Sequence, residues 1–161
     1  MSQDKHLGFL RRAIALSSRA GLEFCTGGPF GAVITKDEQI ISEGMNRVVV
    51  SHDPTWHAEM EAIRSAAVKL QTFKLDACTL YTSAEPCPMC LAATYWAGIK
   101  TIYYAASVDD AARYGDFDDS FIYRQLQLSK DQRQVRSTQL LQEEAAQVWR
   151  LYQAKPNKVP Y

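Results

Sequence analysis

Two cysteines, Cys87 and Cys90, lie three positions apart in the stretch SAEPCPMC, with Pro86 before the first and Pro88 between them. A CxxC pair of this kind can bind zinc through two thiolates, exchange thiols and disulfides, or remain reduced without a chemical role. The choice among these depends on whether the rest of the chain supplies partners for the two sulfurs. Histidine is the first candidate partner, because imidazole often accompanies thiolate as a zinc ligand.

The chain has three histidines, His6, His52 and His57, so few residues can complete a metal site. His6 lies among charged residues near the N-terminus and is interpreted as a solvated side chain. His57 belongs to the triplet HAE at the expected start of one helix, and Cys87 and Cys90 straddle the expected start of another. Helix N-termini carry partial positive charge, which favours thiolate over thiol. A metal held between two such ends is therefore electrostatically reasonable.

Two other interpretations of these residues stay open. Four residues separate His52 from His57, as in paired zinc-binding histidines, and with the two cysteines they would form a closed structural site. Against this, a domain of 161 residues does not need a metal to fold, and His52 precedes Asp53 and Pro54 in a segment expected to be extended or turning. A thiol–disulfide role for the two cysteines is the second alternative.

Glu59, two residues after His57, favours an open, catalytic site. Side chains two residues apart on a helix point about 200° apart, so the two share a target only if it lies near the helix axis at its start. Zinc with two thiolates and one neutral imidazole has no net charge, so a water molecule on it is weakly acidified and needs a base. Glu59 can take that proton and deliver it to a substrate. Without the cysteines, Glu59 would be interpreted as a solvated residue of the first helical turn.

The periodicity of the sequence predicts the elements that must position these residues. Apolar residues at three- and four-residue steps predict a helix over 7–22, which Gly27, Gly28 and Pro29 follow as breakers. Other patterns predict a hairpin over 31–35 and 39–44, strands over 78–83 and 100–107, and helices over 56–70, 88–98 and 140–153. Strands that alternate with helices predict a three-layer α/β/α fold with a partly parallel sheet. The core is complete by about residue 107.

The composition excludes several classes of protein. Hydrophobic residues make up 47% of the chain and charged residues 22%, which is ordinary for a folded globular domain. The 18 basic residues balance the 18 acidic ones, which argues against avid binding of nucleic acid. The N-terminus lacks the pattern of a signal peptide or a membrane helix, so a cytoplasmic protein without a membrane partner is predicted. Cys25 and Cys78 have no motif and are predicted to be core residues.

HAE followed by PCPMC resembles the zinc-dependent cytidine and nucleobase deaminase superfamily, whose members share the HxE and PCxxC motifs. Both motifs occur here in the same order. The resemblance implies a five-stranded mixed sheet between helices and one Zn²⁺ per subunit, held by His57, Cys87 and Cys90. It also implies that a zinc-bound water molecule is the nucleophile and that Glu59 is the proton shuttle.

A narrower resemblance, to bacterial guanine deaminases, covers GGPFGAVI, SHDPTWHAE, LYTSAEPCPMC, the YWA that follows, and FDDSFIY. It implies hydrolysis of guanine, or of related aminotriazines such as ammeline, by a homodimer. Each subunit would be one deaminase domain, 1–161, that exchanges its segment from about 125 to 161 with its partner. The base pocket would be lined by Phe30, Asn46, Trp96, Asp119 and Tyr161, and Asp119 would also be catalytic. The chain departs from this pattern in a Gly-Asp pair before FDDS, in Trp56 and over much of its C-terminal stretch.

The pocket residues also suit a base on chemical grounds, since Phe30 or Trp96 can stack on a ring while Asn46 and Asp119 pair with its polar edge. If these residues do not bind a base, Phe30 and Trp96 would be core aromatic residues, Asn46 a turn residue and Asp119 the cap of the SFIY segment. Tyr161 would then be a frayed chain terminus. Three functional alternatives remain open: a tRNA adenosine deaminase, a cytosine deaminase, and a non-catalytic module whose zinc has four protein ligands.

Overall fold

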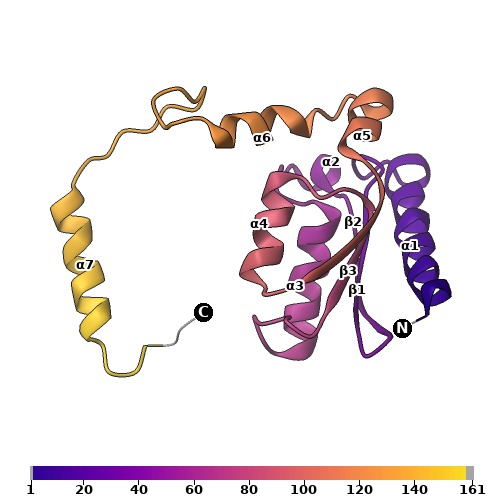
Figure 1. The fold of residues 1–161 in the computed structure, drawn as a ribbon, viewed down its shortest axis with the longest axis horizontal. Coiled ribbons are helices and arrows are strands. Elements are labelled where there is room, and N and C mark those ends of the chain that lie inside the picture. Colours follow the sequence, from indigo (N-terminus) through magenta and orange to yellow (C-terminus); the bar gives the residue numbers. More distant parts are fainter. Residues whose placement is uncertain (1, 159–161) are drawn as a thin grey trace. The chain divides into compact units, whose positions relative to one another are not determined.

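Strands alternate with helices along residues 2–158, the part of the chain that this computed structural model describes (Figure 1). The elements in order are α1 (Gln3–Ser18), the π-helical turn η1 (Arg19–Glu23), β1 (Gly31–Lys36), β2 (Gln39–Met45), α2 (Val48–Ser51), α3 (Ala58–Leu70), β3 (Thr79–Ala84), α4 (Pro88–Trp96), β4 (Thr101–Ala106), α5 (Val108–Gly115), α6 (Asp119–Gln127) and α7 (Gln142–Ala154). The predicted hairpin, the two later strands and all four predicted helices are present.

The four strands form one mixed sheet in the order β2-β1-β3-β4. β1 is antiparallel to both β2 and β3, and β3 is parallel to β4. Because β2 and β3 are both antiparallel to β1, they run in the same direction, and their carboxyl ends lie at the same edge of the sheet. The helices that follow them, α3 and α4, therefore begin at that edge, apart from the short α2 turn that intervenes after β2.

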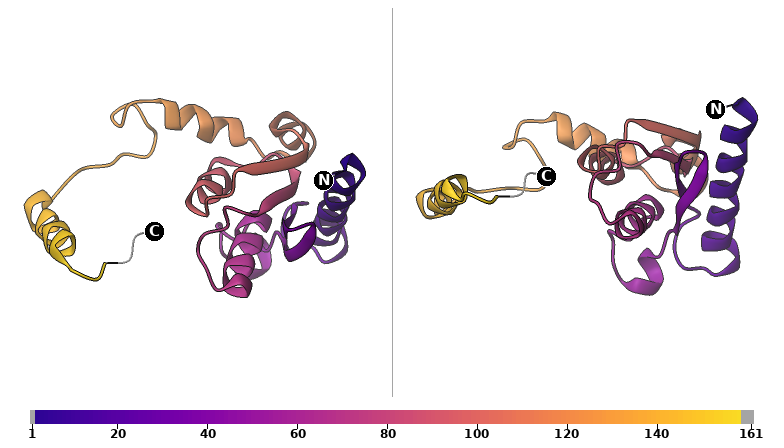
Figure 2. Two further views of the ribbon diagram at one scale, coloured as in Figure 1. Left: turned by 60° about the horizontal axis from the view of Figure 1, so that its bottom comes forward. Right: turned by 90° about the horizontal axis from the view of Figure 1, so that it is seen from below.

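Helices cover both faces of the sheet, which confirms the three-layer α/β/α architecture (Figures 1 and 2). On one face the buried alanines of α3, Ala58, Ala62 and Ala66, pack with strand residues such as Ile34 and Leu80. On the other face Ala13 and Leu16 of α1 pack with Val33 of β1 and Tyr81 of β3, which alternate with the strand residues of the first face. The period of two along each strand separates these clusters, as expected for a sheet buried on both faces.

The expectation of five strands is wrong for the described residues, which contain four. The chain turns into a helix directly after β4, because Ser107 and Asp110 form a capping box at the start of α5. The Ser107 hydroxyl accepts a hydrogen bond from the Asp110 amide, and the Asp110 carboxylate accepts one from the Ser107 amide. Such reciprocal caps fix a helix start, so the chain does not continue as a neighbouring fifth strand.

The described part of the chain divides into two compact units, one that ends at Ile122 and one that begins at Tyr123. The first contains the sheet, its covering helices and every predicted site residue except Tyr161, which lies outside the described residues. Within the second, α7 carries exposed apolar side chains, and Trp149 meets Tyr152 edge to face at 6.5 Å between ring centroids. Arg150 also pairs with Glu143 on this helix at 3.2 Å.

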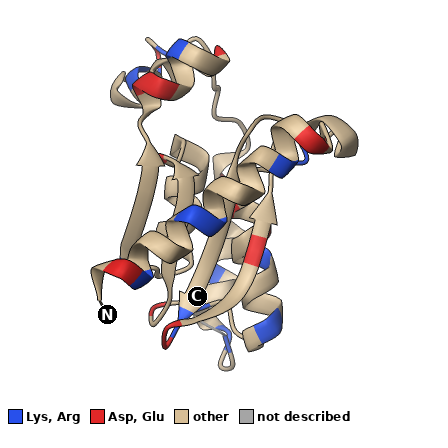
Figure 3. Cartoon of the chain, turned by 90° about the vertical axis from the view of Figure 1, so that its right-hand side faces the viewer, with Lys and Arg blue, Asp and Glu red and all other residues tan. Residues whose placement is uncertain are grey.

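Basic and acidic residues both occur along the helices, strands and loops drawn in Figure 3. No helix among the described residues has both the length and the apolar character to cross a membrane. Cys78 is buried as expected, but Cys25 is exposed, so its prediction as a core residue is wrong. The prediction of a solvated His6 is also wrong, because its Nδ1 lies 2.8 Å from the Tyr81 hydroxyl and its ring packs on Tyr103.

Candidate active site

His57 and Cys87 occupy equivalent positions, each being the last extended residue before a helix. His57 is the N-cap of α3 and Cys87 is the N-cap of α4. Pro88 takes the first position of α4, where its missing N–H costs no hydrogen bond and its fixed φ favours the helix. Cys90 is then the third residue of the helix, and side chains at the N-cap and third positions lie close together. The CxxC spacing thus places both sulfurs at one helix end.

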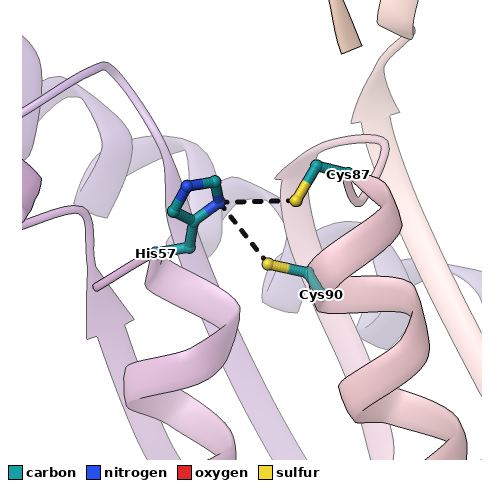
Figure 4. A group of neighbouring side chains, drawn as sticks. All are labelled: His57, Cys87 and Cys90. Atoms are coloured by element: carbon teal, nitrogen blue, oxygen red, sulfur yellow. Dashed lines mark hydrogen bonds between the residues drawn. The ribbon is translucent and has the colours of Figure 1, made fainter. Parts of the chain in front are cut away.

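The His57 ring reaches across to both sulfurs, as Figure 4 shows. Its Nδ1 lies 3.5 Å from the Cys87 sulfur and 3.6 Å from the Cys90 sulfur, and the three ligand atoms all lie within 4.8 Å of one another. Tetrahedral zinc with ordinary Zn–N and Zn–S bonds would hold nitrogen and sulfur about 3.6 Å apart. The three side chains therefore have the chemistry and the spacing of a zinc site.

The closed, four-ligand alternative is not formed by the described residues. His52 ends α2 with a left-handed backbone, at φ 49°, and it does not join the cluster of His57, Cys87 and Cys90. Both cysteines are free thiols, so they are not linked in a disulfide. Three protein ligands leave a fourth tetrahedral position for solvent or substrate, which is the arrangement of catalytic rather than structural zinc.

The hydrogen bonds within the cluster perturb its protonation. Hydrogen bonds from Cys90 and from His57 lower the pKa of Cys87 to about 4. The hydrogen bond with Cys87 raises the pKa of His57. The hydrogen bond between the two cysteines, together with burial, raises the pKa of Cys90. The cluster thus holds a thiolate next to two proton-bearing groups. A divalent cation placed between them would displace these protons, as metals do when they bind thiols and imidazole.

Glu59 is buried beside this cluster, with 3% of its surface exposed. Its Oε1 accepts a hydrogen bond from the Thr82 hydroxyl at 3.1 Å, and its Oε2 lies 3.5 Å from the Cys90 sulfur. Burial raises the pKa of Glu59 above its ordinary value. The interpretation of Glu59 as a solvated helix residue is therefore wrong, and the side chain is placed to hold a proton next to the candidate metal site.

A cavity of about 230 Å³ opens onto the cluster. Of the predicted pocket residues, Phe30, Asn46 and Asp119 line it together with His57, Glu59 and Cys87. The wall also includes residues that sequence reasoning missed, namely Gly28, Val48, Val49, Pro54, Glu85 and Phe117. Trp96 is not among the lining residues, since it lies at the end of α4 with 74% of its surface exposed.

The orientation of Asn46 is fixed by its own neighbourhood. Its Oδ1 accepts a hydrogen bond from the Val48 amide at 3.1 Å, and the side chain is 4% exposed. The same oxygen lies so close to Gly27 that a Cβ there would approach it to 1.9 Å, so Gly27 is required for this packing. With Oδ1 engaged, the amide NH₂ remains to donate a hydrogen bond within the cavity.

Asp119 and Asp118 have different roles at the start of α6. Asp118 accepts hydrogen bonds from the Ser120 hydroxyl and the Phe121 amide, so it acts as the cap that sequence reasoning considered for Asp119. Asp119 instead lines the cavity. Burial and the neighbouring Cys87 raise the pKa of Asp119.

Phe117 forms a wall shared by two cavities. Its ring meets Phe30 nearly edge to face, with centroids 5.0 Å apart. Both rings line the cavity described above and also a second cavity of about 390 Å³, which α1, β3, β4 and α5 border. Gly28 and Gly115 leave room for the Phe117 ring, since a Cβ at either position would come within 3 Å of it.

Comparison with known proteins agrees with this geometry. Residues 3–106 match the family described as the cytidine and deoxycytidylate deaminase zinc-binding region. The chain therefore belongs to this family of zinc-dependent deaminases, as its HAE and PCPMC motifs predict. Guanine deaminase from Bacillus subtilis (strain 168) is 47% identical over 156 residues, which cover 97% of this chain and 99% of that protein.

Other relatives differ in how much of the chain they share. A crystal structure of guanine deaminase from Bacillus subtilis matches with a TM-score of 0.92 at 45% identity, covering 100% of this chain and 99% of that one. The tRNA-specific adenosine deaminase of Buchnera aphidicola subsp. Baizongia pistaciae is 35% identical over 111 residues, which cover 69% of this chain and 66% of that protein.

Proposed function

We propose that this chain is a zinc-dependent guanine deaminase, which hydrolyses guanine to xanthine and ammonia. The likeness to guanine deaminase from Bacillus subtilis over nearly the whole of both chains carries the proposal. The likeness to the tRNA-specific adenosine deaminase of Buchnera covers a smaller share of both proteins. The equal numbers of basic and acidic residues also give no general attraction for a tRNA backbone.

His57, Cys87 and Cys90 are the residues that would hold the metal. Zinc bound at this position would supply Lewis-acid activation of the water nucleophile. Glu59 takes a proton from the attacking water at Oε2, the carboxylate oxygen on the side of Cys90. It then donates this proton to a ring nitrogen of the base, and a second transfer allows the exocyclic amine to leave as ammonia. The net reaction consumes one water molecule and leaves the carboxylate ionised.

The cavity walls would bind and orient the base. Phe30 offers an aromatic face for a planar ring, and the Asn46 NH₂ can donate to a carbonyl oxygen. Asp119 can accept hydrogen bonds from ring N–H or amino groups, and its position beside His57 and Cys87 also suits a second role in proton transfer.

We further propose a cytoplasmic homodimer that exchanges the segment from about 125 to 161. Two observations support it. The second unit of the chain exposes Val148, Trp149 and Leu151 on α7, and α4 of the first unit exposes Tyr95 and Trp96. Exposed apolar groups of this size are typical of association surfaces. The four free cysteines are consistent with a reducing compartment.

Ammonia release from guanine, adenine, cytosine, guanosine and ammeline tests the reaction. We expect guanine to be deaminated fastest, with ammeline as a secondary substrate, and the Glu59→Ala variant to be inactive. Faster release from cytosine, or salt-sensitive binding and deamination of tRNA, would replace the proposal with one of the alternatives. Zinc saturation without release from any of these compounds would instead favour the non-catalytic module.

Subunit mixing tests the exchange of the C-terminal segment. Glu59→Gln and Tyr161→Ala subunits would each be weakly active alone. If the tail acts on the partner, a mixed dimer pairs the intact Glu59 of one subunit with the intact Tyr161 of the other. Random mixing should then restore about a quarter of the wild-type rate. No restoration in verified mixed dimers would mean that each tail serves its own subunit, and monomers in light scattering would exclude exchange altogether.

A further inference from the structure

The hydroxyl group of Thr82 on β3 lies under the candidate active site. Thr82 has no exposed surface, and β3 pairs it with Ala32 on one side and Tyr104 on the other. Its Oγ1 lies 3.1 Å from Oε1 of Glu59 and 3.5 Å from the carbonyl oxygen of Gly31. The hydroxyl has one hydrogen, and the shorter and charge-assisted contact is the one to Glu59. Thr82 therefore donates to the carboxylate.

This hydrogen bond gives the two oxygens of the Glu59 carboxylate different surroundings. The terminal torsion of a glutamate side chain is broad and has little preference of its own, so a partner must select its orientation. Thr82 donates to Oε1 on the side of the sheet, while the Cys90 thiol donates to Oε2 at 3.5 Å and would lose this proton on binding a metal. Strand pairing on both sides of β3 fixes the backbone of Thr82, so its hydroxyl group keeps a fixed position next to the Glu59 carboxylate.

We propose that Thr82 is a positioning residue, which engages Oε1 of Glu59 and thereby assigns proton transfer to Oε2. The inference rests on the proposed deaminase function, in which Glu59 moves a proton between water and the base. With Oε1 occupied on the sheet side, the same oxygen, Oε2, takes and returns the proton without rotation of the carboxylate. Without the hydroxyl, the carboxylate would rotate between orientations of which only one faces the water.

The test compares Thr82→Val, which keeps the side-chain shape without the hydroxyl, with Thr82→Ser, which keeps the hydroxyl. In the zinc-loaded enzymes we expect Thr82→Val to lower kcat for guanine about 10- to 100-fold, the effect of losing a hydrogen bond to a charged group. KM should change less than about threefold, because Thr82 does not line the cavity. Thr82→Ser should keep kcat within about threefold of wild type, since its hydroxyl can reach the same oxygen.

Controls separate positioning from packing. Thr35→Val removes an equally buried hydroxyl from the neighbouring strand β1, away from the cavity, and should leave kcat unchanged. Zinc content per subunit should stay the same in all variants, as measured by atomic absorption. If Thr82→Val does not fold, Thr82→Ala provides the variant without a hydroxyl. A crystal structure of the zinc-loaded variant should show the Glu59 carboxylate rotated from its wild-type orientation.

Three results would overturn the inference: an unchanged kcat in the variant without the hydroxyl, equal losses in Thr82→Val and Thr82→Ser, or an unmoved carboxylate in the crystal structure. The proposed function fails separately, if the wild-type enzyme releases no ammonia from guanine. In that case the same kinetic comparison is made with the base that the enzyme does deaminate. The orientation of the carboxylate tests the role of Thr82 whichever substrate is used.

Discussion

Replacing Glu59 by glutamine separates the proton chemistry of this side chain from its packing. Glutamine has nearly the same shape, and its amide oxygen can still accept the hydrogen bond from Thr82 at 3.1 Å. Its NH₂ group would then face the Cys90 sulfur, which Oε2 approaches to 3.5 Å in the wild type. The variant keeps both neighbours and loses the ability to take up a proton.

The expected effects on rate and on stability have opposite signs. Loss of general acid–base catalysis should lower kcat by roughly 10² to 10⁴. The free energy of unfolding should stay the same or rise by about 1 kcal/mol, because the neutral amide avoids the cost of burying an ionised group that is 3% exposed. Active sites commonly show this trade between stability and activity.

Ammonia release gives the rate, and urea unfolding of the zinc-loaded proteins gives the stability. Glu61→Gln is a matched control on the same helix, since Glu61 accepts a hydrogen bond from the Met45 amide at 2.7 Å and does not line the cavity. We expect this control to keep wild-type kcat. The reasoning is refuted if Glu59→Gln retains more than about a tenth of kcat, or if it unfolds at clearly lower urea concentration than the wild type.

Three further predictions concern the metal and the fold. Chelation should abolish activity while far-UV circular dichroism stays native, because the packed clusters on both sheet faces do not include the metal; loss of the fold on chelation would contradict this. Arg12 donates two hydrogen bonds of 2.7 Å to Glu43 and thereby lowers the pKa of Glu43. This partly exposed pair therefore stabilises the fold at pH values above the ordinary glutamate pKa. The stabilisation is lost as the pH falls through the lowered pKa of Glu43. Arg12→Ala should therefore cost about 0.3–1 kcal/mol at pH 7 and almost nothing near pH 3, as measured by urea unfolding at both pH values; an equal cost at both would disprove the ionic origin. Gly44→Ala should destabilise the protein by about 1–3 kcal/mol in thermal denaturation, because the new Cβ would lie 2.1 Å from the Ala58 carbonyl oxygen. Gly8→Ala on α1 is the control: its Cβ meets nothing within 4 Å, so it should stabilise the protein slightly in the same assay.

The parts of the site that the sequence predicts are those governed by local rules. Cys87 and Cys90 lie at the N-cap and third positions of one helix, and His57 is the N-cap of another, so short motifs were sufficient to find them. The helices α3 and α4 begin at the same edge of the sheet because β2 and β3 run in the same direction. The hairpin and the crossover connection that the sequence predicts give these directions. Glu59 was found because it lies two residues from His57.

Residues whose role depends on long-range packing could not be predicted in this way. Thr82 on β3 contacts Glu59 on α3, and Phe117 contacts Phe30 from a distant loop, so although both lie within quoted sequence stretches, their partners are far away in the sequence. The environments of His6 and Cys25 were wrong for the same reason. His6 has charged neighbours in sequence and tyrosines in space, whereas Cys25 has apolar neighbours in sequence and an exposed position after η1. The fifth strand was expected from family resemblance alone, and the local cap at Ser107 ends the sheet instead.

The edge-on contact between Phe30 and Phe117 has a consequence for enzyme redesign. Two aromatic rings, those of Phe30 and Phe117, border both a hollow of about 230 Å³ and another of about 390 Å³. Two glycines make the space that the Phe117 ring occupies. A smaller side chain at position 117 would remove one of the two rings between the hollows and so widen the space next to the site, which makes this position the first to vary for a bulkier heterocycle.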